Sequence, residues 1–256
     1  MKILCCGRGK KTINPIQKIE KNGLDYENEK KNIRPFDLVL FRGSDFVSSA
    51  IRRMSKAEMG GRYEAGQFSH VGMIVTRDVL DIPELEPGKL YVWESTVSGK
   101  LGGDVTNIDG KAFLGVQIRD FDAVMRSYDN SPKTAVAYSS LIANPIDSMP
   151  CCCIKTRMED LYQTNNGKVY EINISDLFAA MFPKLRFIRS RILTDKFLFC
   201  SELVTLIYNS MRVFKETNIR PENVVPADFV SEGDVDGYGL PRYFNHYKFI
   251  TMHPKQ

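Results

Sequence analysis

The clearest structural signal in the chain is Phe-Cys-Ser-Glu-Leu-Val-Thr-Leu-Ile-Tyr-Asn-Ser-Met, residues 199–211. This stretch predicts a helix, because one apolar face recurs at intervals of three and four residues: Leu203, Val204, Ile207 and Met211. Cys200 lies at the start of this helix and shares the apolar face, so its sulfur is expected to face the core. Free N–H groups and the helix dipole at a helix start favour a thiolate. Cys200 is therefore either an inert core cysteine or a nucleophile.

Outward from this helix, apolar and β-branched runs predict strands, over residues 37–41, 68–76, 89–97, 115–121 and 243–251. Further helices are predicted over residues 45–58 and 132–143, and short helical turns at Pro221 and Pro226. Residues 147–168 are polar and predict an irregular loop. Together these elements predict an α+β fold, in which a small, mainly antiparallel sheet packs against helices.

Two polar residues interrupt the apolar faces of predicted strands. His70 shares one face with Phe68, Gly72 and Ile74, and Gly72 is expected to leave open space beside the imidazole. Glu94 shares a face with Leu90 and Val92, where a carboxylate needs a partner because an unpaired buried charge is costly. A neighbouring His70 would satisfy Glu94 and be held in one tautomer by it. The alternatives are a structural histidine and a charge at a strand end.

A cysteine at a helix start, with a histidine and a carboxylate on neighbouring strands, is the set that nucleophilic thiol catalysis requires. The six cysteines, at positions 5, 6, 151–153 and 200, form neither a spaced disulfide framework nor a C-x-x-C pair. With three histidines in the chain, we expect no metal and no cofactor. The cysteine pattern favours a reducing, intracellular compartment.

The positive charge is concentrated in residues 1–36, which hold nine lysines and arginines against four acidic residues. The rest of the chain is close to neutral, so a nucleic-acid partner is not expected. Cys5 and Cys6 lie in this basic segment and are candidate acylation sites, because acylated cysteines beside basic residues supply two membrane-binding signals. The alternatives are peripheral membrane association through this segment and a solvated tail on a cytoplasmic protein. No apolar run approaches the ~20 residues that a membrane span needs.

Five short segments together resemble one family. Residues 36–43, Phe-Asp-Leu-Val-Leu-Phe-Arg-Gly, are similar to its strand opening, and Ser-His-Val-Gly at 69–72 to its histidine strand. Trp-Glu-Ser at 93–95 matches its acidic position, Cys-Ser-Glu-Leu-Val at 200–204 its nucleophile helix, and Pro-Ala-Asp at 226–228 a late element. This family is the circularly permuted papain-like cysteine hydrolases, related to NlpC-type amidases and including YiiX-like proteins and a poxviral branch.

The resemblance implies a small antiparallel sheet or barrel packed on a nucleophile helix that comes last in the chain. It implies Cys200 as nucleophile, His70 as base and Glu94 as the third member of the triad. The oxyanion donor is expected at the backbone N–H of Cys200 or Ser201. Phe36 departs from the usual glycine of the family. Residues 35–256 are then the hydrolase domain, with an insertion near 148–196, and residues 1–34 are a basic, flexible N-terminal arm.

The implied activity is that of a thiol-dependent amidase or peptidase, or of an acyl-ester hydrolase or acyltransferase. The substrate would be a peptide, isopeptide or lipid acyl group, in a host cell or virion if the chain belongs to the viral branch. One alternative is a catalytically inactive binding or structural protein on the same fold. Another keeps catalysis but uses His246 as the base, in the order of unpermuted enzymes. The oligomeric state is left open.

Overall fold

The computed structural model of the 256-residue chain describes residues 23–44, 46–58, 66–96, 107–110, 115–129, 133–168, 198–215, 219–230 and 239–252. Residues 1–22 of the predicted arm, with Cys5 and Cys6, lie outside the described residues, as do residues 169–196 of the predicted insertion. Among the described residues, no helix combines the length and apolar character needed to cross a membrane.

One seven-stranded sheet forms the centre of the structure, in the order β1-β7-β6-β2-β3-β4-β5. Neighbouring strands are antiparallel except for the parallel pair β1–β7. The strands are β1 (Leu24–Asp25), β2 (Leu38–Arg42), β3 (His70–Val75), β4 (Tyr91–Thr96), β5 (Gly115–Asp120), β6 (Ala135–Ser139) and β7 (Lys248–Thr251). This mostly antiparallel sheet with helices confirms the predicted α+β class.

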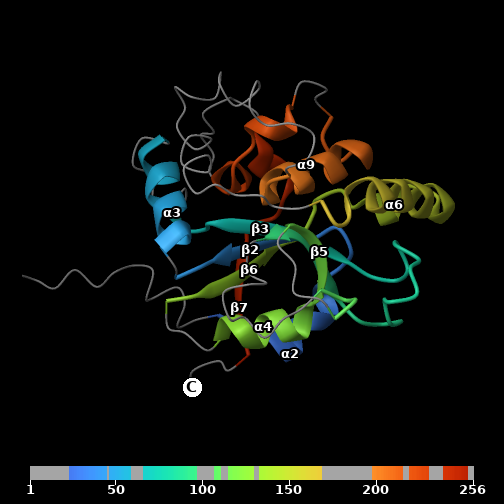
Figure 1. Cartoon of the computed structure of the whole chain (residues 1–256), viewed down its shortest axis with the longest axis horizontal. Coiled ribbons are helices and arrows are strands. Elements are labelled where there is room, and N and C mark those ends of the chain that lie inside the picture. The colour runs from blue at the N-terminus through green and yellow to red at the C-terminus, as the bar shows by residue number, and fades with distance from the viewer. Residues whose placement is uncertain are drawn as a thin grey trace, which may run out of the picture.

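Helices cover both faces of the sheet (Figure 1). The α-helices are α2 (Tyr26–Glu29), α3 (Phe46–Glu58), α4 (Phe121–Asp129), α5 (Pro145–Ser148), α6 (Cys151–Asn165) and α9 (Cys200–Ser210). Short 3-10 turns follow at Lys30–Asn32, Pro221–Asn223, Pro226–Phe229 and Leu240–Tyr243. In Figure 1, α9 and α6 lie on one side of the strands, and α4 and α2 lie on the other. The two 3-10 turns at Pro221 and Pro226 are the predicted helical turns.

The sheet separates two apolar cores, because successive side chains of a strand point to opposite faces. On one face, strand residues pack with the apolar stripe of α9; this core includes Leu38, Leu40, Val71, Met73, Trp93, Leu203, Val204 and Ile207. On the other face they pack with α4 and α2; this core includes Val39, Phe41, Ile74, Val92, Val124, Met125 and Tyr26. Strands buried on both faces explain the continuous apolar runs that predicted β2 to β5.

Two predicted elements are wrong. Residues 135–139 form strand β6, where a helix over 132–143 was predicted. β6 lies between β2 and β7 and hydrogen-bonds to both, so its alanines serve a buried strand despite their helix propensity. Residues 147–168 are not an irregular loop, because α5 and α6 occupy most of them. One face of α6 packs against the α9 core, through Ile154, Met158, Leu161 and Tyr162.

The packed structure begins before residue 35, since residues 24–33 fold against the sheet. β1 pairs with β7, and Tyr26 is completely buried. The Tyr26 hydroxyl donates to Asp122 Oδ1 of α4 at 2.6 Å, and Lys30 Nζ lies 2.6 Å from both oxygens of the same carboxylate. The part of the predicted N-terminal arm that the structure describes is therefore attached to the domain.

Candidate active site

Cys200 is the first residue of α9 and is nearly buried, with 9% of its surface exposed. Two contacts hold the helix start in place. The Phe199 N–H donates to Glu202 Oε2 at 3.2 Å, which closes the first turn. The Ser95 hydroxyl, next to Glu94 on β4, donates to the carbonyl oxygen of Leu198. The chain that enters α9 is thus fastened to the end of β4.

The Cys200 sulfur lies where the pairing of β3 with β4 ends. Paired residues run from Val75–Tyr91 to Gly72–Glu94, and the backbone N–H of Val71, the next residue of β3, donates to the sulfur of Cys200. The Ser201 N–H, in the first turn of α9, donates to it as well. The sulfur therefore accepts two backbone hydrogen bonds, which favour the thiolate.

His70, the first residue of β3, contacts both other predicted members of the triad. Its Nε2 lies 2.5 Å from Glu94 Oε2, and its ring hydrogen-bonds to Cys200. Because Nε2 is occupied by Glu94, Nδ1 is the nitrogen that remains for the thiol. The Phe41 ring packs against the imidazole, with 5.3 Å between ring centroids. The three residues named from the sequence are thus brought into one hydrogen-bonded chain.

Arg119 of β5 is a fourth member that the sequence did not indicate. Its Nε lies 2.5 Å from Glu94 Oε1, its Nη2 contacts the same oxygen, and only 3% of its surface is exposed. Within β5, the polar Gln117 and Arg119 alternate with the apolar Val116 and Ile118. This alternation was a signal for a polar patch on one strand face. It could be linked to Glu94 only once β5 was known to pair with β4.

Gly72 does not leave open space beside the imidazole, contrary to the prediction. A Cβ atom at this position would lie 2.6 Å from Val92 Cγ2 and 3.2 Å from Glu94 Cβ. The side chains of Val92 and Glu94 on β4 fill the space over Gly72. Glycine here permits the close approach that places Glu94 against His70.

The surroundings shift the pKa values of the triad toward a charged resting state. Burial alone would raise the pKa of the Cys200 thiol, but the His70 charge and the two N–H donors lower it overall. Burial alone would lower the pKa of His70, but Cys200 and Glu94 raise it to about 10. Burial alone would raise the pKa of Glu94, but Arg119 and His70 lower it. The site can therefore hold a thiolate, an imidazolium and a carboxylate side by side.

The alternative base, His246, is in a different environment. It is exposed, its Nδ1 lies 2.9 Å from the carbonyl oxygen of Tyr247, and its ring packs on the Tyr247 ring. Among the residues that the structure describes, no group of His, Cys, Asp or Glu side chains is arranged to hold a metal ion. Neither a protein-family model nor a curated protein sequence matches this chain.

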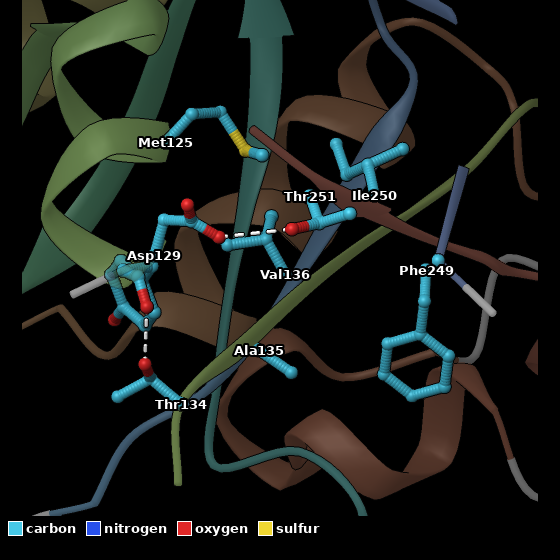
Figure 2. Close-up of a pocket in the computed structure, with 10 residues that line it drawn as sticks. Met125, Asp129, Thr134, Ala135, Val136, Phe249, Ile250 and Thr251 are labelled. Carbon is cyan, nitrogen blue, oxygen red and sulfur yellow. Dashed lines mark hydrogen bonds between the residues drawn. The ribbon is translucent and has the colours of Figure 1, made fainter. Parts of the chain in front are cut away.

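Figure 2 shows a pocket of about 70 Å³ between the end of α4 and strands β6 and β7. Its polar groups bond to one another: the Thr251 hydroxyl donates to Asp129 Oδ1 at 2.9 Å, and the Thr134 hydroxyl donates to the Tyr128 carbonyl oxygen. The Phe41 ring, which is fully buried, packs on the Tyr128 ring as well as on His70. Phe41 thus separates this pocket from the triad, so we do not assign it to the active site.

Proposed function

We propose that this protein is a thiol-dependent hydrolase of the permuted papain-like type, with Cys200 as nucleophile, His70 as general base and acid, and Glu94 as the residue that orients His70. The observation that carries this proposal is the hydrogen-bonded chain Cys200–His70–Glu94 with the Cys200 pKa lowered. A nucleophile, a base and an orienting group in this order are the requirements of covalent catalysis. The order of the three residues along the chain supports the permuted arrangement.

In the proposed reaction, the Cys200 thiolate attacks the carbonyl carbon of an amide or ester. The carbonyl electrons move to oxygen, and collapse of the tetrahedral intermediate expels the leaving amine or alcohol, which takes a proton from His70. A thioester with Cys200 remains. Water, or an acceptor in acyl transfer, then attacks this thioester while His70 accepts its proton, and the Cys200 thiolate is the leaving group. Glu94 stabilises the imidazolium at each proton transfer.

The oxyanion of the intermediate needs donors at the helix start. The first N–H groups of a helix have no partner within that helix, so the Cys200 N–H is our candidate donor. The Ser201 N–H is already bonded to the sulfur in the resting state. Peptide, isopeptide and lipid acyl groups remain the candidate substrates, and the shared chemistry is an acyl group on nitrogen or oxygen.

The test uses a protein in which Cys200 is the only cysteine, since Cys151, Cys152 and Cys153 are exposed and would also react. Cys5, Cys6 and the three exposed cysteines are changed to Ser, and p-nitrophenyl acetate is the probe. We expect a burst of nitrophenol and an added acetyl group on Cys200, both lost in Cys200→Ala and His70→Ala but kept in His246→Ala. Glu94→Gln should fold and turn over more slowly, because a neutral amide no longer favours the imidazolium.

An inactive binding protein on the same fold predicts a different result. The ester would then give no burst of nitrophenol and no acetyl group on Cys200, whatever the rate at which iodoacetamide alkylates this thiol. That outcome would contradict the proposal.

A further inference from the structure

Glu94 is completely buried and is held from both sides. One carboxylate oxygen contacts His70 Nε2 and the other contacts Arg119, each at 2.5 Å. Cys200, His70, Glu94 and Arg119 therefore form a chain of four groups whose charges alternate in sign. When all four are charged, their sum is zero. Without Arg119, the same buried chain would carry a net negative charge.

Folding alone gives no reason for this arrangement. A buried ion pair is expensive to desolvate, and replacement of such a pair by apolar side chains is often neutral or stabilising. The neighbouring positions on the same sheet face accept apolar residues, since Val92 lies directly opposite Arg119 and Ile74 lies beyond Val92. A guanidinium at this position has a more direct use, which is to keep the Glu94 carboxylate ionised in a place where burial opposes its charge.

We propose that Arg119 is a positioning residue of the active site, which holds Glu94 ionised and turned toward His70 and so maintains the thiolate–imidazolium state of Cys200 and His70. Arg119 acts through Glu94 and touches neither the thiol nor a substrate. The proposal deepens the proposed function and rests on it for the use of the thiolate in turnover. The charge state itself can be measured without any substrate.

Loss of the guanidinium has a definite consequence in this chain. Within the part of the chain that the structure describes, Glu94 feels the charges of Arg119 and His70, His70 feels those of Cys200 and Glu94, and Cys200 feels that of His70. Among the described residues, the side chains next to these groups include Phe41, Val92 and Gln117, which is paired with Glu94, and all three are uncharged. Without Arg119, Glu94 takes up a proton more readily. A neutral carboxylic acid favours the imidazolium less, and the pKa of Cys200 rises.

The experiment measures the rate at which iodoacetamide alkylates Cys200 between pH 5 and pH 10, in the protein with Cys200 as its only cysteine. The variants are Arg119→Met, the matched control Arg119→Lys, Glu94→Gln, and the double variant Arg119→Met with Glu94→Gln. We expect Arg119→Met to move the midpoint of the profile up by about one pH unit or more. Each unit of this shift lowers the thiolate fraction below the midpoint, and with it the alkylation rate, about tenfold. Arg119→Lys, which keeps the charge, should stay close to the unmodified profile.

The double variant tests whether Arg119 acts through Glu94. Its profile should lie no higher in pH than that of Glu94→Gln alone, because no carboxylate is left for Arg119 to hold and the unpaired guanidinium charge is gone. If Arg119→Met does not fold, Arg119→Gln carries the same test, since it removes the charge and keeps a hydrogen-bond donor.

Two results would overturn the role of Arg119. One is a lower urea midpoint for Arg119→Met with an unchanged alkylation profile, which is what a purely structural residue predicts. The other is a further shift to higher pH in the double variant beyond Glu94→Gln. Failure of the proposed function looks different: the profile of Cys200 would shift as expected in Arg119→Met, while no ester would acylate Cys200.

Discussion

Replacement of Gly72 by alanine tests the strand contact on which the site depends. In a strand, glycine is usually less stable than alanine by about 0.5–1 kcal/mol, so Gly72→Ala would be mildly stabilising if the space were free. The structure predicts the opposite sign. The added methyl group would lie 2.6 Å from Val92 Cγ2, 3.2 Å from Glu94 Cβ and 3.4 Å from the Trp93 carbonyl oxygen.

Relief of this overlap requires a movement of β4 or of its side chains. Overpacking of a tight core costs about 1–3 kcal/mol. After the gain from reduced backbone entropy is subtracted, we expect Gly72→Ala to lower the free energy of unfolding by about 1–2 kcal/mol. The movement also draws Glu94 away from His70, so the alkylation profile of Cys200 should shift to higher pH.

The matched variant is Val92→Ala, which removes the atom that the new methyl group would strike. Alone, Val92→Ala should be destabilising, because truncation of this fully buried side chain leaves a cavity. Combined with Gly72→Ala, it should cost at least about 1 kcal/mol less than the sum of the single variants. Urea unfolding of the four proteins measures this. Strict additivity, or a Gly72→Ala protein as stable as the unmodified one, would refute the close approach of β3 and β4.

Two further predictions concern stability. Burial raises the pKa of Asp37 from 3.8 to about 6, although the backbone N–H groups of Arg34 and Leu141 oppose this. Because the folded state binds the proton more tightly, the contribution of Asp37 to the free energy of unfolding falls by about 2 kcal/mol as the pH rises from 4 to 6. Urea midpoints of the unmodified protein should therefore decline relative to Asp37→Asn over this range, and a constant difference would contradict the assignment. Tyr26→Phe, which deletes the hydrogen bond to Asp122, should cost about 1–2 kcal/mol in urea unfolding, and no loss would mean that residues 24–33 are not packed in solution.

The elements that local patterns specify were predicted from the sequence. The three- and four-residue spacing along α9 and the apolar runs of β2 to β5 depend only on residues within each element. The alanines of β6 have a local preference for a helix, and pairing with both β2 and β7 overrides it. In α6 the stripe Ile154, Met158 and Leu161 has helical spacing, yet the surrounding polar residues and the cysteine triplet hide it.

For the candidate site, the sequence by itself determined that Glu94 shares a strand face with Val92 and that Cys200 begins a helix. It placed Phe68 on one face with Ile74, but β3 begins only at His70, and Phe68 packs in the core on the opposite side of the sheet from Ile74. It could not determine that Glu94 reaches both His70 and Arg119, which lie 24 and 25 residues away along the chain. Those contacts depend on the register of β3, β4 and β5. The thiol joins them because the β3–β4 pairing stops at Gly72 and the chain before α9 is fastened to Ser95. Hydrogen bonds and charge pairing act over a few ångströms, and only the tertiary structure brings groups so far apart in sequence within that distance.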